Sequence, residues 1–168
     1  MSIRIWIMIA LVVLVATGST SVRADPKEGQ LAPDFSVTTL DGRQVNLQSL
    51  KNKVIILNYW ATWCGPCRSE MPALEAYYRA HRREGLEIIA LSQDDADQVR
   101  KVKALAKSYA YPFALKAKSD TKAYGPAAQL PMSFVIDRKG ILRADGSHRT
   151  LIFTPQLLAS VVTPLLKN

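Results

Sequence analysis

The sequence predicts an α/β domain of three layers (α/β/α), with helices packed on a mixed β-sheet. Residues 54–59 are β-rich and apolar on consecutive positions, which is typical of a strand buried on both faces of a sheet. Strand-like and helix-like segments then alternate along the chain, and it ends on a predicted hairpin followed by a helix.

The first part of the chain predicts export. Arg4 supplies a positive start, residues 5–16 are apolar without interruption, and small or apolar residues precede a possible cut after Ala24. This apolar stretch is shorter than the ~20 residues that span a bilayer. We therefore predict a signal peptide at residues 1–24, with an uncleaved N-terminal anchor as the alternative. Residues 25–168 are then expected to form one domain in the periplasm or on the extracytoplasmic face of the membrane.

The predicted domain opens with a β-hairpin and then a helix that carries the only cysteines of the sequence. Asp41-Gly42 is a strong hairpin turn between strands at residues 35–40 and 43–47. The buried strand at 54–59 is followed by a helix from Cys64 to about residue 84, where Gly85 ends it.

The remaining segments continue the alternation. Thr154 and Pro155 are a favourable cap and first position for the closing helix. The predicted elements are a strand at 86–91, a helix at 97–109, a strand at 112–115, a helical turn at 120–124, strands at 133–137 and 141–144, and a helix at 156–166.

The motif Cys64-Gly65-Pro66-Cys67 predicts redox chemistry. Two thiols at this spacing can close a disulfide across one turn of backbone. A purely structural disulfide rarely spans so short a loop, because its stabilisation grows with loop length. A zinc site needs two further donors, and His81 and His148 lie far apart in the sequence. We therefore expect no metal site, and we place both histidines on the surface.

The formal net charge of +8 is spread along the chain. Nucleic-acid binding is not expected, because no base-stacking motif accompanies the charge and exported chains rarely meet nucleic acid. A solvated basic face is the simpler interpretation. A solvated loop is also expected at Asp94 and Asp95.

Several segments, in their order along the chain, resemble the thioredoxin superfamily and its exported TlpA/ResA-like branch. They are residues 29–35, 41–47, 57–64, 93–123 and 130–137. The resemblance covers nearly all of residues 25–168. It implies a thioredoxin-like fold with an N-terminal β-hairpin extension and an inserted αβ element at 93–123. Residues 126–129 depart from the pattern, because they lack the glycine expected near the proline that follows.

Two positions bear on the proton chemistry of the motif. Asn58 stands where thioredoxin carries a buried aspartate, and an asparagine cannot accept a proton at ordinary pH. Glu70 stands where the exported branch carries a glutamate, three residues after Cys67. The resemblance favours Glu70 as the base for the Cys67 thiol, and the alternative is an acid that complements the first helical turn.

The other site residues follow from the motif and from the resemblance. Cys64, at the helix N-terminus, is expected to be exposed and to attack a partner's disulfide, and Cys67 to resolve the mixed disulfide. The resemblance implies a cis peptide bond at Pro131, against Cys64, with Leu130 presenting backbone groups to an extended peptide. Trp63 beside the motif is the third expected substrate contact.

The predicted function is an exported thiol–disulfide oxidoreductase that mainly reduces disulfides in partner proteins. We expect a monomer without a cofactor, and the resemblance implies a membrane thiol electron donor and a task such as cytochrome c or copper-site maturation. Two alternatives stay open. A thiol peroxidase shares the segment 29–35, but it needs a proline before Cys64 that the sequence does not supply. A copper chaperone would use Cys64 and Cys67 as soft ligands.

Overall fold

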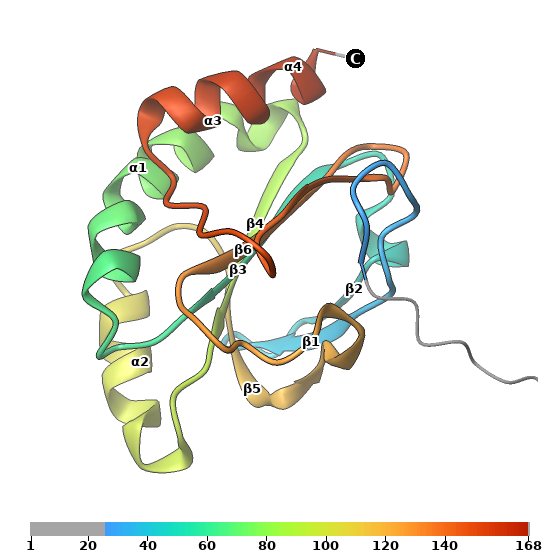
Figure 1. The fold of residues 1–168 in the computed structure, drawn as a ribbon. Coiled ribbons are helices and arrows are strands. Elements are labelled where there is room, and N and C mark those ends of the chain that lie inside the picture. The colour runs from blue at the N-terminus through green and yellow to red at the C-terminus, as the bar shows by residue number, and fades with distance from the viewer. Residues whose placement is uncertain (1–25, 168) are drawn as a thin grey trace, which may run out of the picture.

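The structure, a computed structural model, describes residues 26–167. These residues form a seven-stranded mixed sheet with the strand order β2-β1-β5-β4-β3-β6-β7 (Figure 1). The strands are β1 (Ser36–Thr39), β2 (Gln44–Asn46), β3 (Val54–Trp60), β4 (Leu86–Ser92), β5 (Phe113–Asp120), β6 (Met132–Ile136) and β7 (Leu142–Asp145). The helices are α1 (Gly65–His81), α2 (Val99–Ala106), α3 (Pro155–Val161) and α4 (Thr163–Leu166). The 3₁₀ segments are η1 (Gln48–Leu50), η2 (Arg82–Glu84), η3 (Ala96–Gln98) and η4 (Lys122–Tyr124).

Strand β3 is internal and positions the redox motif. It pairs in parallel with β4 and antiparallel with β6, and all of its residues are buried. Asn58 of β3 lies opposite Ser133 of β6 in this register. Because β3 ends at Trp60, the motif begins just beyond a strand that is held on both sides.

The predicted hairpin and inserted element are confirmed. Strands β1 and β2 pair antiparallel at one edge of the sheet, and β1 also pairs with β5. Helix α2 and strand β5 lie between β4 and β6 in the chain, and β5 runs parallel to β4. The insertion therefore joins the hairpin to the central strands.

The α-helices gather on one face of the sheet (Figure 1). Met71 of α1, Val102 of α2 and Leu158 of α3 belong to one apolar cluster. The second cluster, on the other face, receives Leu50 from η1 and Tyr124 from η4. Within residues 26–167 the layer on that face is thus built of 3₁₀ turns and loops. Segment η4 stays short because Gly125 has a φ of 79° and the next residue, Pro126, has no N–H to continue a helix.

Several element boundaries differ from the sequence prediction, three of them for reasons that the structure shows. The strand expected at 112–115 extends as β5 to Asp120, because its polar second half pairs with β1. The helix expected at 97–109 begins as η3 and its α-helical part ends at Ala106, where hydrogen bonds to the third residue back tighten the last turn. The closing helix divides into α3 and α4, because Pro164 has no N–H for the next helical hydrogen bond.

Among residues 26–167, no helix combines the length and apolar character needed to cross a membrane. The predicted signal peptide or anchor at residues 1–24 lies outside the described part of the chain.

Candidate active site

Cys64 and Cys67 form a disulfide at the start of α1. Cys64 is the N-cap residue, and its Sγ accepts a 3.2 Å hydrogen bond from the backbone N–H of Cys67. Pro66 occupies the first turn, where its missing N–H costs no helical hydrogen bond. The unpaired N–H groups and the positive end of the helix dipole therefore point toward Cys64, as the sequence predicted.

The cysteines differ less in exposure than the sequence suggested. Cys64 is 5% exposed and Cys67 is fully buried. The expectation of an openly exposed Cys64 is therefore wrong for the disulfide form, because the residue packs into the apolar cluster beneath α1. Cys64 is still the more exposed of the two residues.

Asp94 holds the turn that leads into the motif. The residue is buried, and its carboxylate accepts hydrogen bonds from the Thr62 backbone N–H at 2.9 Å, the Thr62 hydroxyl at 2.6 Å and the Ser92 hydroxyl at 2.8 Å. The predicted solvated loop is therefore wrong at Asp94. The reason is that β3 and β4 are parallel neighbours, so their carboxyl ends bring Asp94 beside Thr62.

Glu70 is a buried carboxyl on α1, one helical turn after Cys67. It is 2% exposed, and its carboxylate accepts 2.8 Å hydrogen bonds from the Asn58 side-chain amide and from the Phe153 backbone N–H. Burial raises the pKa of Glu70 from 4.5 to about 7, because desolvation of the carboxylate outweighs the two hydrogen bonds that favour it. Glu70 thus combines the position and the proton affinity that a base near neutral pH requires.

Asn58 extends this arrangement to the neighbouring strand. Its amide nitrogen also donates a 2.9 Å hydrogen bond to the hydroxyl of Ser133, its register partner on β6. Ser133 stands two residues after Pro131. The hydrogen-bonded network around Glu70 therefore connects α1, β3, β6 and the loop after β7 that contains Phe153.

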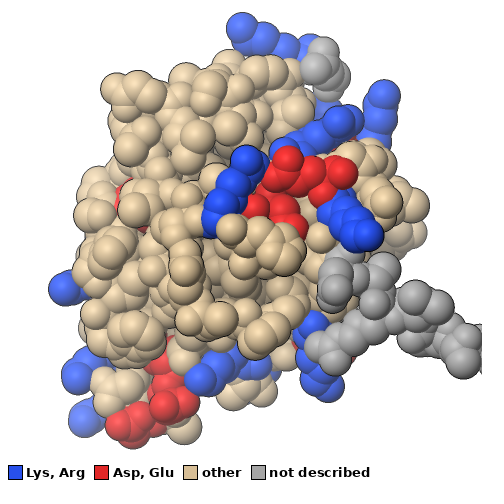
Figure 2. Space-filling model, viewed as in Figure 1, with Lys and Arg blue, Asp and Glu red and all other residues tan. Residues whose placement is uncertain are grey.

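The three residues expected to contact substrate are all in the described part of the chain. The peptide bond between Leu130 and Pro131 is cis, as predicted. Leu130 is half-buried, whereas Trp63 is 70% exposed. Trp60, by contrast, is buried in the core. Figure 2 shows a mixed cluster of acidic and basic side chains on one part of the surface. A broad area around the loop that leads into β6 carries few charged side chains in this view.

Comparison with known proteins places the chain in a family. Residues 29–145 match the AhpC/TSA family. The chain belongs to this family, within the thioredoxin superfamily. It is 37% identical over 142 residues to the thiol–disulfide oxidoreductase ResA of a Bacillus cereus strain, and the match covers 80% of this chain and 81% of that protein. The sequence-based resemblance is thereby confirmed, and the chain is a thiol–disulfide oxidoreductase.

Two further relatives agree with this identification. The thioredoxin-like protein YneN of Bacillus subtilis is 38% identical over 120 residues, which are 70% of this chain and 69% of YneN. The solution structure of a proposed protein disulfide isomerase from Bacteroides thetaiotaomicron matches with a TM-score of 0.71 and 34% identity. That match covers 85% of this chain and 92% of the other.

The two histidines of the oxidoreductase lie at the end of α1 and in the loop after β7. The His81 ring nitrogen contacts Glu84 at 3.0 Å, and His148 is exposed in the loop after β7. Within the described residues, no three side chains of histidine, cysteine, aspartate or glutamate come together as a group that could hold a metal ion.

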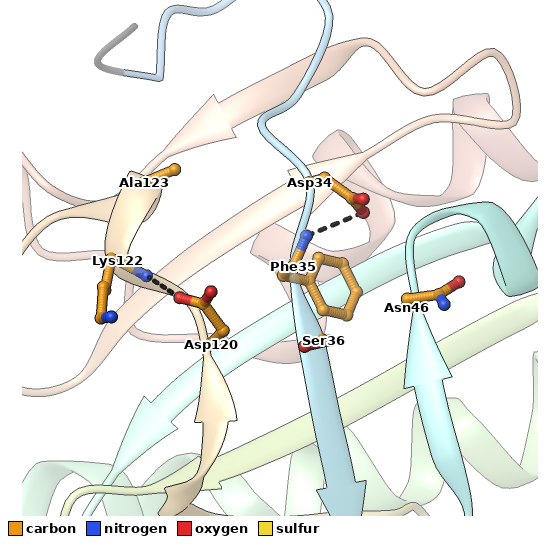
Figure 3. Close-up of a pocket in the computed structure, with 7 residues that line it drawn as sticks. All are labelled: Asp34, Phe35, Ser36, Asn46, Asp120, Lys122 and Ala123. Atoms are coloured by element: carbon orange, nitrogen blue, oxygen red, sulfur yellow. Dashed lines mark hydrogen bonds between the residues drawn. The ribbon is translucent and has the colours of Figure 1, made fainter. Parts of the chain in front are cut away.

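A surface hollow of the oxidoreductase lies away from the redox motif, near the ends of β1, β2 and β5 (Figure 3). The carboxylates in its lining have backbone partners. Asp34 accepts a 2.9 Å hydrogen bond from the Phe35 N–H, and Asp120 accepts a longer one from Lys122. None of the predicted site residues lines this hollow.

Sequence reasoning missed four contributors to the site. Asp94, Ser133 and Phe153 act through contacts between segments far apart in the chain, and no local pattern signals them. Gly146 packs directly on Ser133, where a Cβ would lie 2.5 Å from the Ser133 carbonyl oxygen. A glycine directly after a strand was the only available signal for this close approach.

Proposed function

We propose that this oxidoreductase reduces disulfide bonds in partner proteins outside the cytoplasm. The observation that carries the proposal is the buried Glu70 carboxylate, one helical turn after Cys67, with a pKa of about 7. A reductant must deprotonate its second thiol in a site that excludes water, and Glu70 can take that proton.

The reaction has two exchange steps. In the dithiol form, the Cys64 thiolate attacks one sulfur of the partner's disulfide, and a mixed disulfide forms while the other partner sulfur leaves as a thiolate. Glu70 then takes the proton of Cys67, and the Cys67 thiolate attacks the Cys64 sulfur. The Cys64–Cys67 disulfide forms and the partner leaves with both cysteines reduced. Two electrons thus pass from this chain to its partner, and a thiol donor must return them.

Trp63, Leu130 and Pro131 are the proposed contacts for the partner. Trp63 offers an exposed aromatic surface beside Cys64. Leu130 lies in a segment without a regular strand partner, so an extended chain has backbone groups to pair with. This arrangement suits an unfolded or flexible cysteine-bearing segment better than a folded surface.

Export and the electron donor are the parts of the proposal that rest on the sequence and the resemblance. The layout of residues 1–24 supports secretion, and an exported reductant needs electrons from across the membrane. A membrane thiol donor, a monomeric state and a role in cytochrome c or copper-site maturation complete the proposal. Sequencing the N-terminus of the protein from fractionated cells distinguishes a cut after Ala24 from a retained anchor.

Trapping the mixed disulfide tests the proposed reaction. Reduced Cys67→Ser protein, offered a disulfide-bonded protein, is expected to accumulate an adduct through Cys64 that dithiothreitol releases. The matched control, Cys64→Ser, is expected to form no adduct. An adduct that depends on Cys67 instead, or full turnover by Cys67→Ser, contradicts the assigned roles.

Two assays separate the alternatives. The segment from Ala61 to Trp63 contains no proline, so we expect negligible peroxide consumption with a thiol donor. A peroxidase would consume peroxide rapidly under these conditions. A copper chaperone would bind copper tightly in the dithiol form and reduce disulfides negligibly.

A further inference from the structure

Asn58 uses both protons of its side-chain amide inside the protein. The nitrogen donates to a Glu70 carboxylate oxygen at 2.8 Å and to the Ser133 hydroxyl oxygen at 2.9 Å, and the residue is 1% exposed. An asparagine amide has two N–H donors, so these two contacts exhaust its donor capacity. Both contacts lie in the protein interior, where a hydrogen bond is electrostatically stronger than in water.

Ser133 holds the Asn58 amide in one orientation. It faces Asn58 across the β3–β6 register and is completely buried. Gly146 packs against it so closely that a Cβ at that position would lie 2.6 Å from the Ser133 backbone nitrogen. Ser133 therefore has little room to move. Its hydroxyl oxygen accepts from the Asn58 amide nitrogen, and this contact keeps that nitrogen on the side of Glu70.

Among the described residues, no cation is one of the groups that shift the pKa of Glu70. On its own helix Cys67 precedes Glu70 by one turn and is held in the disulfide, and Tyr111 is an ionisable group that senses the Glu70 charge. The loop after β7 contributes the Phe153 N–H, and β3 contributes Asn58. Burial disfavours the charged form of Glu70, and hydrogen bonds from two neutral donors partly offset this effect. Only one of these donors is a side chain that a substitution can remove.

We infer that Asn58, held in orientation by Ser133, is a positioning residue that keeps Glu70 available as a carboxylate for the Cys67 proton. A neutral donor stabilises the charged carboxylate without taking up a proton itself. An aspartate at this position would instead set a second acid at hydrogen-bond distance from Glu70, and the two would share a proton. The link to catalysis rests on the proposed function, whereas the effect on Glu70 does not.

Titration of Glu70 in the oxidised protein tests the inference directly. Carbon NMR of the carboxyl group is expected to show the Asn58→Leu midpoint at least about one pH unit higher than in the wild type, a tenfold change in acid constant. Ser133→Ala, which keeps Asn58 but frees its orientation, is expected to shift the midpoint in the same direction by a smaller amount. An unchanged midpoint in Asn58→Leu overturns the inference.

The unmodified protein provides a second measurement that does not depend on how the variants fold. The Asn58 side-chain amide resonances are expected to change with pH at the Glu70 midpoint, because their proton acceptor gains or loses its charge. If the chemical shifts of the Asn58 side-chain amide do not change at the Glu70 midpoint, the inference is overturned.

The pH profile of disulfide reduction separates the inference from the proposed function. In Asn58→Leu, the pH profile of disulfide reduction is expected to move with the Glu70 midpoint. Asn58→Gln keeps an amide donor, so its profile is expected to shift less than that of Asn58→Leu. If the Glu70 midpoint moves while the profile does not, Asn58 still controls Glu70, and the proposed proton transfer from Cys67 is what fails.

Discussion

Glu70 on α1 accepts a 2.8 Å hydrogen bond from the backbone N–H of Phe153, which lies 83 residues later in the loop after β7. This bond ties the helix that carries the disulfide to a loop that leads into α3. A buried carboxyl group therefore has a structural contact and a proposed chemical role at once. Substitutions that separate the two roles are the most informative.

Glu70→Gln is expected to slow disulfide reduction near neutral pH by about 100-fold, because a glutamine cannot take the Cys67 proton. The fold is expected to persist, since the amide oxygen can still accept one of the two hydrogen bonds. Stopped-flow measurement of the step that resolves the mixed disulfide gives the rate. Glu75→Gln on the same helix is the matched control, because Glu75 contacts Arg79 and Ala110 instead. Equal rates in Glu70→Gln and Glu75→Gln would remove Glu70 from the mechanism.

The stability of the oxidised protein is expected to fall as the pH rises from about 4.5 to about 7 through the Glu70 contribution. The folded state holds the Glu70 proton more tightly than the unfolded chain does, because the Glu70 pKa is about 7 when folded and near 4.5 when unfolded. The stabilisation by the protonated carboxyl is therefore full below pH 4.5 and is lost as the carboxyl ionises at about pH 7. The shift corresponds to roughly 3 kcal/mol in the free energy of unfolding. Urea unfolding at several pH values measures this slope. Glu70→Gln is expected to lack this part of the slope, and the same slope in both proteins would contradict the assignment.

Asp94→Ala is expected to destabilise the protein by roughly 2–4 kcal/mol, because the half-buried Thr62 N–H loses its acceptor and two hydroxyl groups lose theirs. The attack by Cys64 is also expected to slow, since Thr62 lies two residues before it. Asp95→Ala is the control, because the Asp95 side chain is exposed and forms a surface ion pair with Lys116. The result to look for is a large difference between the two variants in urea unfolding. Similar small losses would mean that Asp94 does not hold the turn.

Gly146→Ala is expected to cost about 1–3 kcal/mol of stability, because the new Cβ would meet the backbone of Ser133 at 2.5 Å. Oxidised Gly65→Ala is a suitable comparison for stability, since no heavy atom lies within 4 Å of the Cβ it would add. Thermal unfolding of both variants tests this expectation. A Gly146→Ala protein as stable as the wild type would show that β6 can move away, and it would weaken the argument that Ser133 is fixed.

The sequence predicted the parts of the fold that local patterns determine. The apolar run of β3, the turn at Asp41-Gly42 and the stop at Gly85 each have a cause within a few residues, and the structure confirms them. The second half of β5 was missed because its side chains are mostly exposed and no apolar run marks it. Only pairing with β1, far away in the sequence, makes that segment a strand.

The same distinction holds for the site. Cys64, Cys67 and Glu70 share one helix, so their spacing alone brings them together. Ser133 and Phe153 reach the site through strand register and a loop, and neither carries a chemical signature of its own. Asp94 was misread because an aspartate after a strand is usually solvated, and only the parallel β3–β4 pairing buries it.

The reduction potential of the Cys64–Cys67 pair tests the central claim, that this chain is a reductant, most directly. Equilibration in dithiothreitol or glutathione redox buffers, followed by tryptophan fluorescence, gives the value. We expect a potential close to that of thioredoxin, about −270 mV, and in any case below about −230 mV. A potential above about −180 mV, in the range of disulfide isomerases and oxidants, would contradict the account.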